Sequence, residues 1–464
     1  LELSATLVPT KPLGGVKLEA IGLRAKWGED IDPSPSVSIT RIRASYDLKE
    51  VISATGELDL DGGIAGELDL RVIPAGIAGR AEFAVREPEE GKSGPPMVQL
   101  GATLRFATPV PLGGSGLALV GVQGRVVANG TRNLPDHADI IQQELGWARL
   151  GALQKYTQEA GQHAVGFGAL LGTAPDAGFM LNASGMLTLA FPEIEVALTA
   201  ELAFVSLPKG IPTDEGVADD EELPAETADV LAILVASKRG VTLAAEGTVE
   251  IPFQMRAHIP IGAHFPTNGD PFYIRFGSDG YAGTTETAPR PGQPVTATLY
   301  PGLVDLDGWA FVMIEEGGLP DLGGARAEGL DLAGFSVGMG LGFDLSRSFG
   351  PFRLRAYAQV IAGLGLEPLL VSADLQLGGE LDFGIASVHV AGKIQVTFTQ
   401  DYLELDGSVT GRISFLFFDL EGTAHIRERL GQNASLPAPP SLLRRLSFVD
   451  QQDAELGNAD AGTV

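Results

Sequence analysis

Apolar and polar residues alternate with a period of two through most of residues 352–418. Alternation of this kind is typical of a β-strand that has one apolar and one polar face. The alternation falls into four segments, because the parity of the apolar positions changes at Glu367-Pro368, at Gly384 and at Gln400-Asp401. Consecutive strands joined by tight turns pair antiparallel, so the pattern predicts a four-stranded meander.

The predicted strands are unusually long. Each has roughly 13–16 residues and would span about 45–50 Å, whereas most strands have about 3–10 residues. The meander would therefore present one broad apolar face, on which we expect a groove for a hydrophobic ligand. The candidate lining residues are the apolar positions Leu375, Leu377, Leu381, Phe383, Ile394, Val396, Phe398, Ile413, Phe415 and Phe417.

Similar alternation begins at Leu1 and recurs along the chain. We therefore predict an all-β, mainly antiparallel fold in which the meander is the last part of an extended curved sheet, a groove, or a barrel or sandwich, with one or two short helices. Residues 56–60 and 66–70 repeat the sequence GELDL. This repeat predicts two strands of a hairpin, with Asp61-Gly62-Gly63 in the turn.

Breaks in the pattern divide the chain. Residues 1–205 form the N-terminal part of the predicted β unit, and helical spacing of apolar residues predicts a helical insertion near 138–155. Residues 206–229 are acidic and rich in proline, which predicts a solvated loop. Residues 230–430 form the C-terminal part of the β unit, and residues 431–464 form a polar tail.

Composition narrows the partners. The 464 residues carry a formal net charge of −27, which argues against nucleic acid or an anionic membrane as the partner. The absence of cysteine excludes disulfides, thiolate metal sites and cysteine nucleophiles. There is no run of about 18 apolar residues, so we expect a soluble protein without a transmembrane helix, in a compartment that the sequence leaves open.

Signatures of catalysis are missing from the sequence. The glycine runs are not followed by the residues of a phosphate-binding loop, and there is no G-x-S-x-G. Of the six histidines, His258 and His264 lie six residues apart and are the candidates for a metal site, but strand and turn positions explain them better. Glu404 and Asp406 before Gly407 resemble a calcium turn, for which ordinary turn chemistry is the alternative. We therefore expect no enzymatic activity, no metal and no cofactor.

Three glycine-rich stretches, residues 111–124, 164–187 and 269–280, resemble a family of large, uncharacterised bacterial β-rich proteins that carry a domain of unknown function. The most distinctive part is the GTAPDxGF-type segment at residues 172–179. The resemblance covers roughly residues 100–345. It implies a bacterial source and a long β architecture, and it implies no activity.

Two functions remain open at this point. A long sheet with an apolar face can bind or carry a hydrophobic ligand such as a lipid. Alternatively, the apolar faces pack on each other in a closed core, and the protein is a structural or assembly scaffold without a ligand, with protein partners or copies of itself. We favour the first function, because the strands are longer than a packed sandwich needs.

Overall fold

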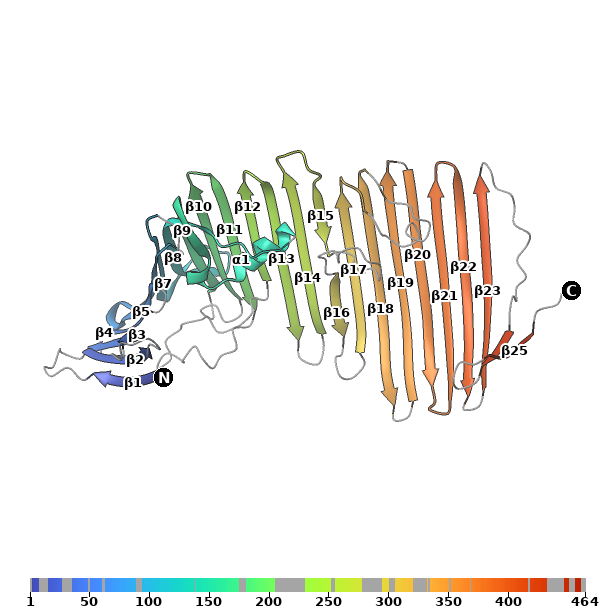
Figure 1. Cartoon of the computed structure of the whole chain (residues 1–464), viewed down its shortest axis with the longest axis horizontal. Coiled ribbons are helices and arrows are strands. Elements are labelled where there is room, and N and C mark those ends of the chain that lie inside the picture. Colours follow the sequence, from blue (N-terminus) through green and yellow to red (C-terminus); the bar gives the residue numbers. More distant parts are fainter. Residues whose placement is uncertain are drawn as a thin grey trace, which may run out of the picture. The chain divides into compact units, whose positions relative to one another are not determined.

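The computed structural model describes most of the chain. The described residues are 2–7, 16–26, 36–48, 51–60, 63–88, 94–137, 139–174, 181–204, 230–251, 255–277, 294–299, 305–319, 332, 334–349, 352–367, 369–415, 418–431, 446–449 and 455–459. They belong to two compact units, Leu1–Thr242 and Leu243–Val464. The predicted all-β antiparallel fold is confirmed, because nearly every described element is a strand and all the described strand pairs are antiparallel (Figure 1).

The first unit is a meander in chain order. Its strands are β1 (Glu2–Leu7), β2 (Val16–Lys26), β3 (Ser36–Leu48), β4 (Ile52–Asp59), β5 (Ile64–Val72), β6 (Ile77–Arg86), β7 (Met97–Pro111), β8 (Leu117–Arg132), β9 (Tyr156–Thr173), β10 (Leu181–Phe191), β11 (Glu195–Phe204) and β12 (Val230–Ser237). Each strand pairs with the next. The repeated GELDL segments form the predicted hairpin, in which Leu58 of β4 lies opposite Gly66 of β5.

Helix α1 (Ile140–Arg149) is the one α-helix among the described residues, and it lies inside the predicted insertion at 138–155. The Asp139 side chain caps its start by accepting a hydrogen bond from the Ile141 backbone N–H at 2.9 Å. Its buried side chains are Ile141, Glu144, Leu145, Trp147 and Ala148, most of which share one face of the helix. Short 3₁₀ turns occur at Ile73–Ala75 and Ala152–Gln154.

The second unit continues the same architecture. After β13 (Gly240–Ile251), which contains the boundary between the units, come β14 (Met255–Pro266), β15 (Tyr273–Phe276), β16 (Val295–Leu299), β17 (Asp305–Glu315), β18 (Ser336–Phe349), β19 (Phe352–Leu366), β20 (Leu369–Asp382), β21 (Ala386–Thr399), β22 (Tyr402–Phe415), β23 (Phe418–Gly431), β24 (Leu446–Val449) and β25 (Glu455–Ala459). Strands β15 and β16 each pair with both β14 and β17, and from β17 onward each strand pairs with the next.

The four predicted strands of the long meander are β19, β20, β21 and β22. Each has 14 or 15 residues, and their ladders run without a register shift. The β20–β21 turn uses Gly384 in the left-handed region, with φ of 77°, and its N–H donates to the Asp382 side chain at 2.7 Å. The predicted loop at residues 206–229 lies outside the described residues. The predicted tail at residues 431–464 contains strands β24 and β25.

One face of the second unit carries the polar side chains of the meander, and cross-strand ion pairs connect them. Glu404 on β22 is 3% exposed because Arg427 and Arg429 on β23 both bind its carboxylate. Burial opposes ionisation of Glu404, but the hydrogen bonds from Arg429 and Arg427 hold its pKa below the usual value. The neighbouring Asp374 accepts from Gln395 at 3.0 Å.

The same face becomes apolar toward β17. Phe311 and Met313 on β17 are buried in a cluster with Leu370 of β20 and with Leu319 and Leu332, whose backbones form a bridge across the sheet surface. The aromatic rings fit because their cross-strand neighbours lack side chains: a Cβ on Gly342 would lie 2.6 Å from a ring atom of Trp309. Parts of this face are therefore buried, some under ion pairs and some in a local core.

Candidate functional site

The opposite face of the second unit is apolar across six strands, β18 to β23. The register brings the apolar positions into rows, of which one reads Phe343, Ala358, Leu377, Gly392, Val409, Ala424 and the next reads Leu341, Val360, Leu375, Ile394, Gly407, Ile426. A third row reads Val337, Leu364, Val371, Phe398, Leu403, Leu430. We call these rows, with the Met339 row that lies between them and the Leu345 row beside them, the apolar face of the second unit.

Large side chains of this face are exposed. Leu377 is 46% exposed, Val409 is 56% exposed and Leu341 is 58% exposed, although each is surrounded by apolar neighbours in the rows. Side chains of the same size on the other face, such as Phe311 and Met313, are at most 2% exposed. The two faces of one sheet therefore differ, since the large apolar side chains of the polar face are buried and those of the apolar face are exposed.

The open face is large. Six strands about 4.8 Å apart and five rows about 6.7 Å apart give a face of roughly 24 Å by 27 Å. This is roughly 650 Å², at or above the largest apolar patch of about 300–600 Å² on a typical monomer, and patches of that size are often functional. The charged side chain in these rows is Glu428, which lies on β23 opposite Leu405.

Most of the predicted groove residues belong to this face. Leu377, Ile394 and Phe398 are exposed there, and Leu375 and Val396 are half-buried between them. Leu381 and Ile413 are also exposed and lie in the next row, beyond the Leu345 row. Phe383 and Phe415 lie at strand ends, where their rings contact Phe352 and Phe418 respectively. Phe417 lies outside the described residues.

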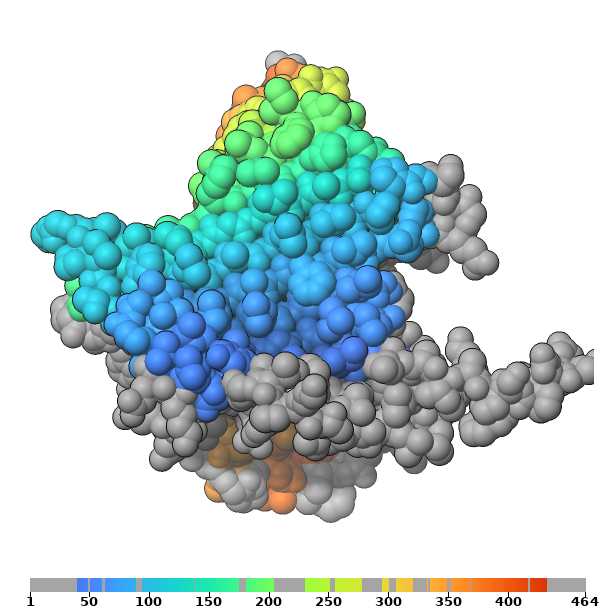
Figure 2. Space-filling model, turned by 90° about the vertical axis from the view of Figure 1, so that its left-hand side faces the viewer, coloured from blue at the N-terminus to red at the C-terminus, as the bar shows by residue number. Residues whose placement is uncertain are grey.

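The first unit has an apolar face of its own, which the sequence analysis did not single out. One row reads Leu68, Ala81, Ala102, Gly124, Phe167, Leu187, Leu198, Leu234 across β5 to β12. Phe167 in this row is 58% exposed, and Gly124 beside it adds no side chain. Figure 2 shows the surface of this unit, coloured blue to green. Alternation within β7 to β10 contained the signal, but the many glycines and alanines weakened it.

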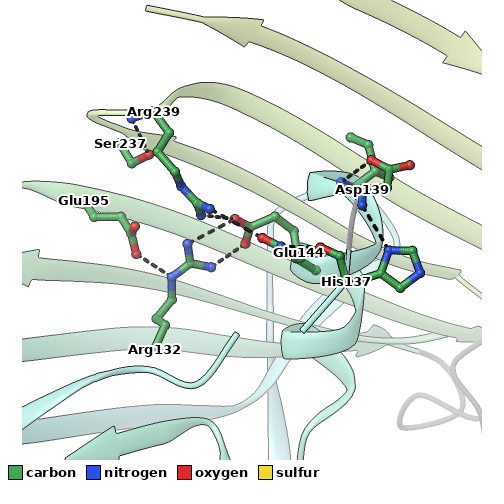
Figure 3. A network of polar contacts seen from close by, with 9 residues as sticks. Arg132, His137, Asp139, Glu144, Glu195, Ser237 and Arg239 are labelled. Carbon is green, nitrogen blue, oxygen red and sulfur yellow. Dashed lines mark hydrogen bonds and ion pairs between the residues drawn. The ribbon is translucent and has the colours of Figure 1, made fainter. Parts of the chain in front are cut away.

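Helix α1 lies on the other face of the first unit, and a polar network joins it to the sheet. Figure 3 shows the Arg132 guanidinium of β8 between the carboxylates of Glu144 on α1 and Glu195 on β11. Glu144 is fully buried and also accepts from Arg239, which lies between β12 and β13, at 3.1 Å. Burial acts against the charge of Arg132, but Glu144 and Glu195 raise its pKa above the ordinary value.

Aromatic contacts complete this anchor of the helix. The Arg132 guanidinium lies 4.8 Å from the Trp147 ring, and the Trp147 indole N–H donates to the Lys155 carbonyl at 2.7 Å. Lys155 in turn donates to the Ala148 carbonyl at the end of α1. Burial, with a smaller effect of Arg125, lowers the pKa of Lys155 to about 8. The network thus fixes α1 on the sheet through charges drawn from four separate segments.

The other residues that the sequence suggested for metal sites take part in ordinary strand contacts. The His258 Nδ1 atom lies 3.8 Å from Glu246 Oε1, and the His264 ring contacts Tyr273. A hydrogen bond of 2.9 Å joins His425 Nε2 to the Asp406 carboxylate, and Arg427 and Arg429 bind the Glu404 carboxylate. Among the described residues, no group of three or more His, Asp or Glu side chains is arranged to hold a metal ion.

The sequence was also compared with known proteins. No protein-family model matches the chain, and the search of curated proteins found no match. The resemblance of residues 111–124, 164–187 and 269–280 to a family of bacterial β-rich proteins therefore stays a prediction. In the part of the chain that the structure describes, no helix is long and apolar enough to cross a membrane.

Proposed function

We propose that the protein binds the hydrocarbon part of a lipid on the apolar face of its second unit, without catalysing a reaction. The observation that carries the proposal is the exposure of Leu341, Leu377, Ile394 and Val409 in adjacent rows of one face. Exposed apolar area of this kind is unfavourable in water by about 25 cal/mol per Å², so an apolar occupant would stabilise the protein.

The chemistry of the face favours hydrocarbon over a polar ligand. Its rows contain aliphatic and aromatic side chains, alanine and glycine, and the charged Glu428 stands on the last long strand. Acyl chains need no hydrogen-bond partners, whereas typical protein interfaces carry about one hydrogen bond per 100–200 Å². The apolar face of the first unit has the same chemistry and is a second area on which acyl chains could lie.

A structural scaffold is the second candidate. Because the large side chains of the apolar face are exposed in the single chain, a scaffold would need a second protein surface on them. Such a surface would be another copy or a different partner, and it would compete with lipid for the same rows. The mass of the particle in solution and its lipid content therefore separate the two functions.

The proposal predicts co-purification of lipid. We expect organic extraction and mass spectrometry of the full chain, purified without detergent, to find lipid in at least stoichiometric amount. Replacing Leu377 and Val409 together by glutamate should reduce that amount at least fivefold, because two carboxylates in the same row must lose water to contact an acyl chain.

The matched control is Thr423→Glu, which adds a carboxylate on the polar side of β23, where Thr423 pairs with Thr410. It should leave the lipid content unchanged. Both proteins should remain folded, since substitutions at exposed positions change the free energy of unfolding by about 0.5 kcal/mol each. A lipid-free wild type that sediments as an ordered oligomer would reject the proposal in favour of the scaffold.

A further inference from the structure

A pocket lies on the covered face of the first unit, at the ends of strands β8 to β12 and beside the helix anchor. Its volume is about 310 Å³, and its walls include Arg132, Tyr156, Glu159, His163 and Thr188. Small-molecule sites begin at about 300 Å³. The pocket lies on the opposite side of the sheet from the apolar row of the first unit that contains Phe167 and Leu187, so it is separate from the apolar face of that unit.

The pocket has a rigid polar wall. Arg132 is fixed by Glu144 and Glu195, and Lys238 and Arg239 at the rim are paired with Glu193 and Glu144. The cationic side chains are therefore already neutralised by carboxylates. An anionic ligand would approach Glu159, Glu193 and Glu195 without finding an unpaired cation among them.

One buried hydroxyl lines the pocket without making a hydrogen bond of normal geometry among the described residues. It belongs to Tyr156, which is 1% exposed, and the side chains of Thr188 and Arg125 lie near it. A buried hydroxyl normally has a hydrogen-bond partner, so an unpartnered one that lines a pocket points to a ligand group. Burial also raises the pKa of Tyr156, so the hydroxyl keeps its proton and can both donate and accept.

These features select the class of ligand. Carboxylates only accept hydrogen bonds, guanidinium and ammonium groups only donate, and the Tyr156 and Thr188 hydroxyls do both. Ligand hydroxyl groups can donate to the carboxylates, accept from the cationic groups and do either with the two hydroxyls, and they add no charge to the pocket. We propose that this pocket binds an uncharged polyhydroxylated ligand, of the class of sugars and cyclitols, either free or as the headgroup of a lipid.

The test is ligand-observed saturation-transfer NMR on the full chain with glucose, galactose, N-acetylglucosamine and myo-inositol. We expect at least one of them to receive saturation and Tyr156→Phe to weaken its binding at least fivefold, because only the unpartnered hydroxyl is removed. Glu159→Gln, at an exposed position, should weaken it at least twofold. Tyr357→Phe, on β19 of the second unit, is the matched control and should have no effect.

Competitors and a lipid-like probe complete the experiment. Inorganic phosphate and ethanolamine should not displace the bound sugar. An octyl glycoside of that sugar, used below its micelle concentration, should bind tenfold more tightly than the sugar if the natural ligand is a lipid headgroup. It should bind as tightly as the sugar if the natural ligand is a free sugar. Tyr156→Phe should weaken the binding of the sugar and of its octyl glycoside. The proposal is overturned if none of the four compounds receives saturation, if Tyr156→Phe and Glu159→Gln both bind as wild type does, or if phosphate displaces the sugar.

Discussion

Replacing Arg132 by methionine is expected to lower the free energy of unfolding of the first unit by about 3–5 kcal/mol. The substitution leaves Glu144, which is fully buried, with Arg239 as its remaining cationic partner, and the side chain of Arg239 is 40% exposed. A buried carboxylate that loses its main partner keeps its desolvation penalty. Denaturant unfolding, followed by tryptophan fluorescence, measures the loss.

Two further variants test whether the unpaired charge of Glu144 causes the loss of stability in Arg132→Met. Arg132→Met combined with Glu144→Leu should recover much of the lost stability, because a buried ion pair replaced by apolar residues of similar volume is often neutral. Arg43→Met, which breaks an exposed pair with Glu57, should change the free energy of unfolding by at most about 1 kcal/mol. A loss below about 1 kcal/mol at neutral pH would show that α1 is not anchored by this network.

The second large effect concerns one aromatic residue on each face of the second unit. Phe311→Ala should lower the free energy of unfolding by about 3–5 kcal/mol, because Phe311 is 1% exposed in the cluster with Met313 and Leu370. Phe343→Ala removes the same ring from the apolar face, where it is 45% exposed, and should lower the free energy by only about 1 kcal/mol.

The comparison is read from denaturant unfolding of the two variants under identical conditions. The ring size is the same and the two residues lie on adjacent strands, so the difference reports how each face is covered. Equal losses of several kcal/mol would mean that the apolar face is buried by another surface in solution, as the scaffold function requires. Bound lipid would increase the loss of unfolding free energy that Phe343→Ala causes, so both variants are measured as delipidated protein.

The strands of the second unit were predictable because one physical signal dominates there. In β19 to β22, alternation is nearly unbroken for 14 or 15 residues, and a one-residue slip would move every apolar side chain to the other face. The helix was predictable from the spacing of Ile141, Leu145 and Ala148. Within it, Glu144 on the apolar side was a readable anomaly, since a charge at such a position needs a buried partner.

The identity of that partner was not predictable. Arg132, Glu195 and Arg239 come from three different segments, and only the pairing of β8 to β12 brings them to one strand-end edge. The pocket beside them depends on the same long-range contacts. Exposure of the apolar face was equally hidden, because alternation looks the same whether the apolar side of a sheet faces another layer or solvent.

The most direct test of the central claim is photocrosslinking from the apolar face itself. A benzophenone amino acid would replace Leu377 or Val409 on that face, or Thr423 on the polar face as the control, in full chain expressed in cells and purified without detergent. After irradiation, intact-mass spectrometry should find lipid adducts at Leu377 and Val409 and none at Thr423. Adducts to protein alone at Leu377 and Val409, or lipid adducts of equal yield at Thr423, would contradict the account.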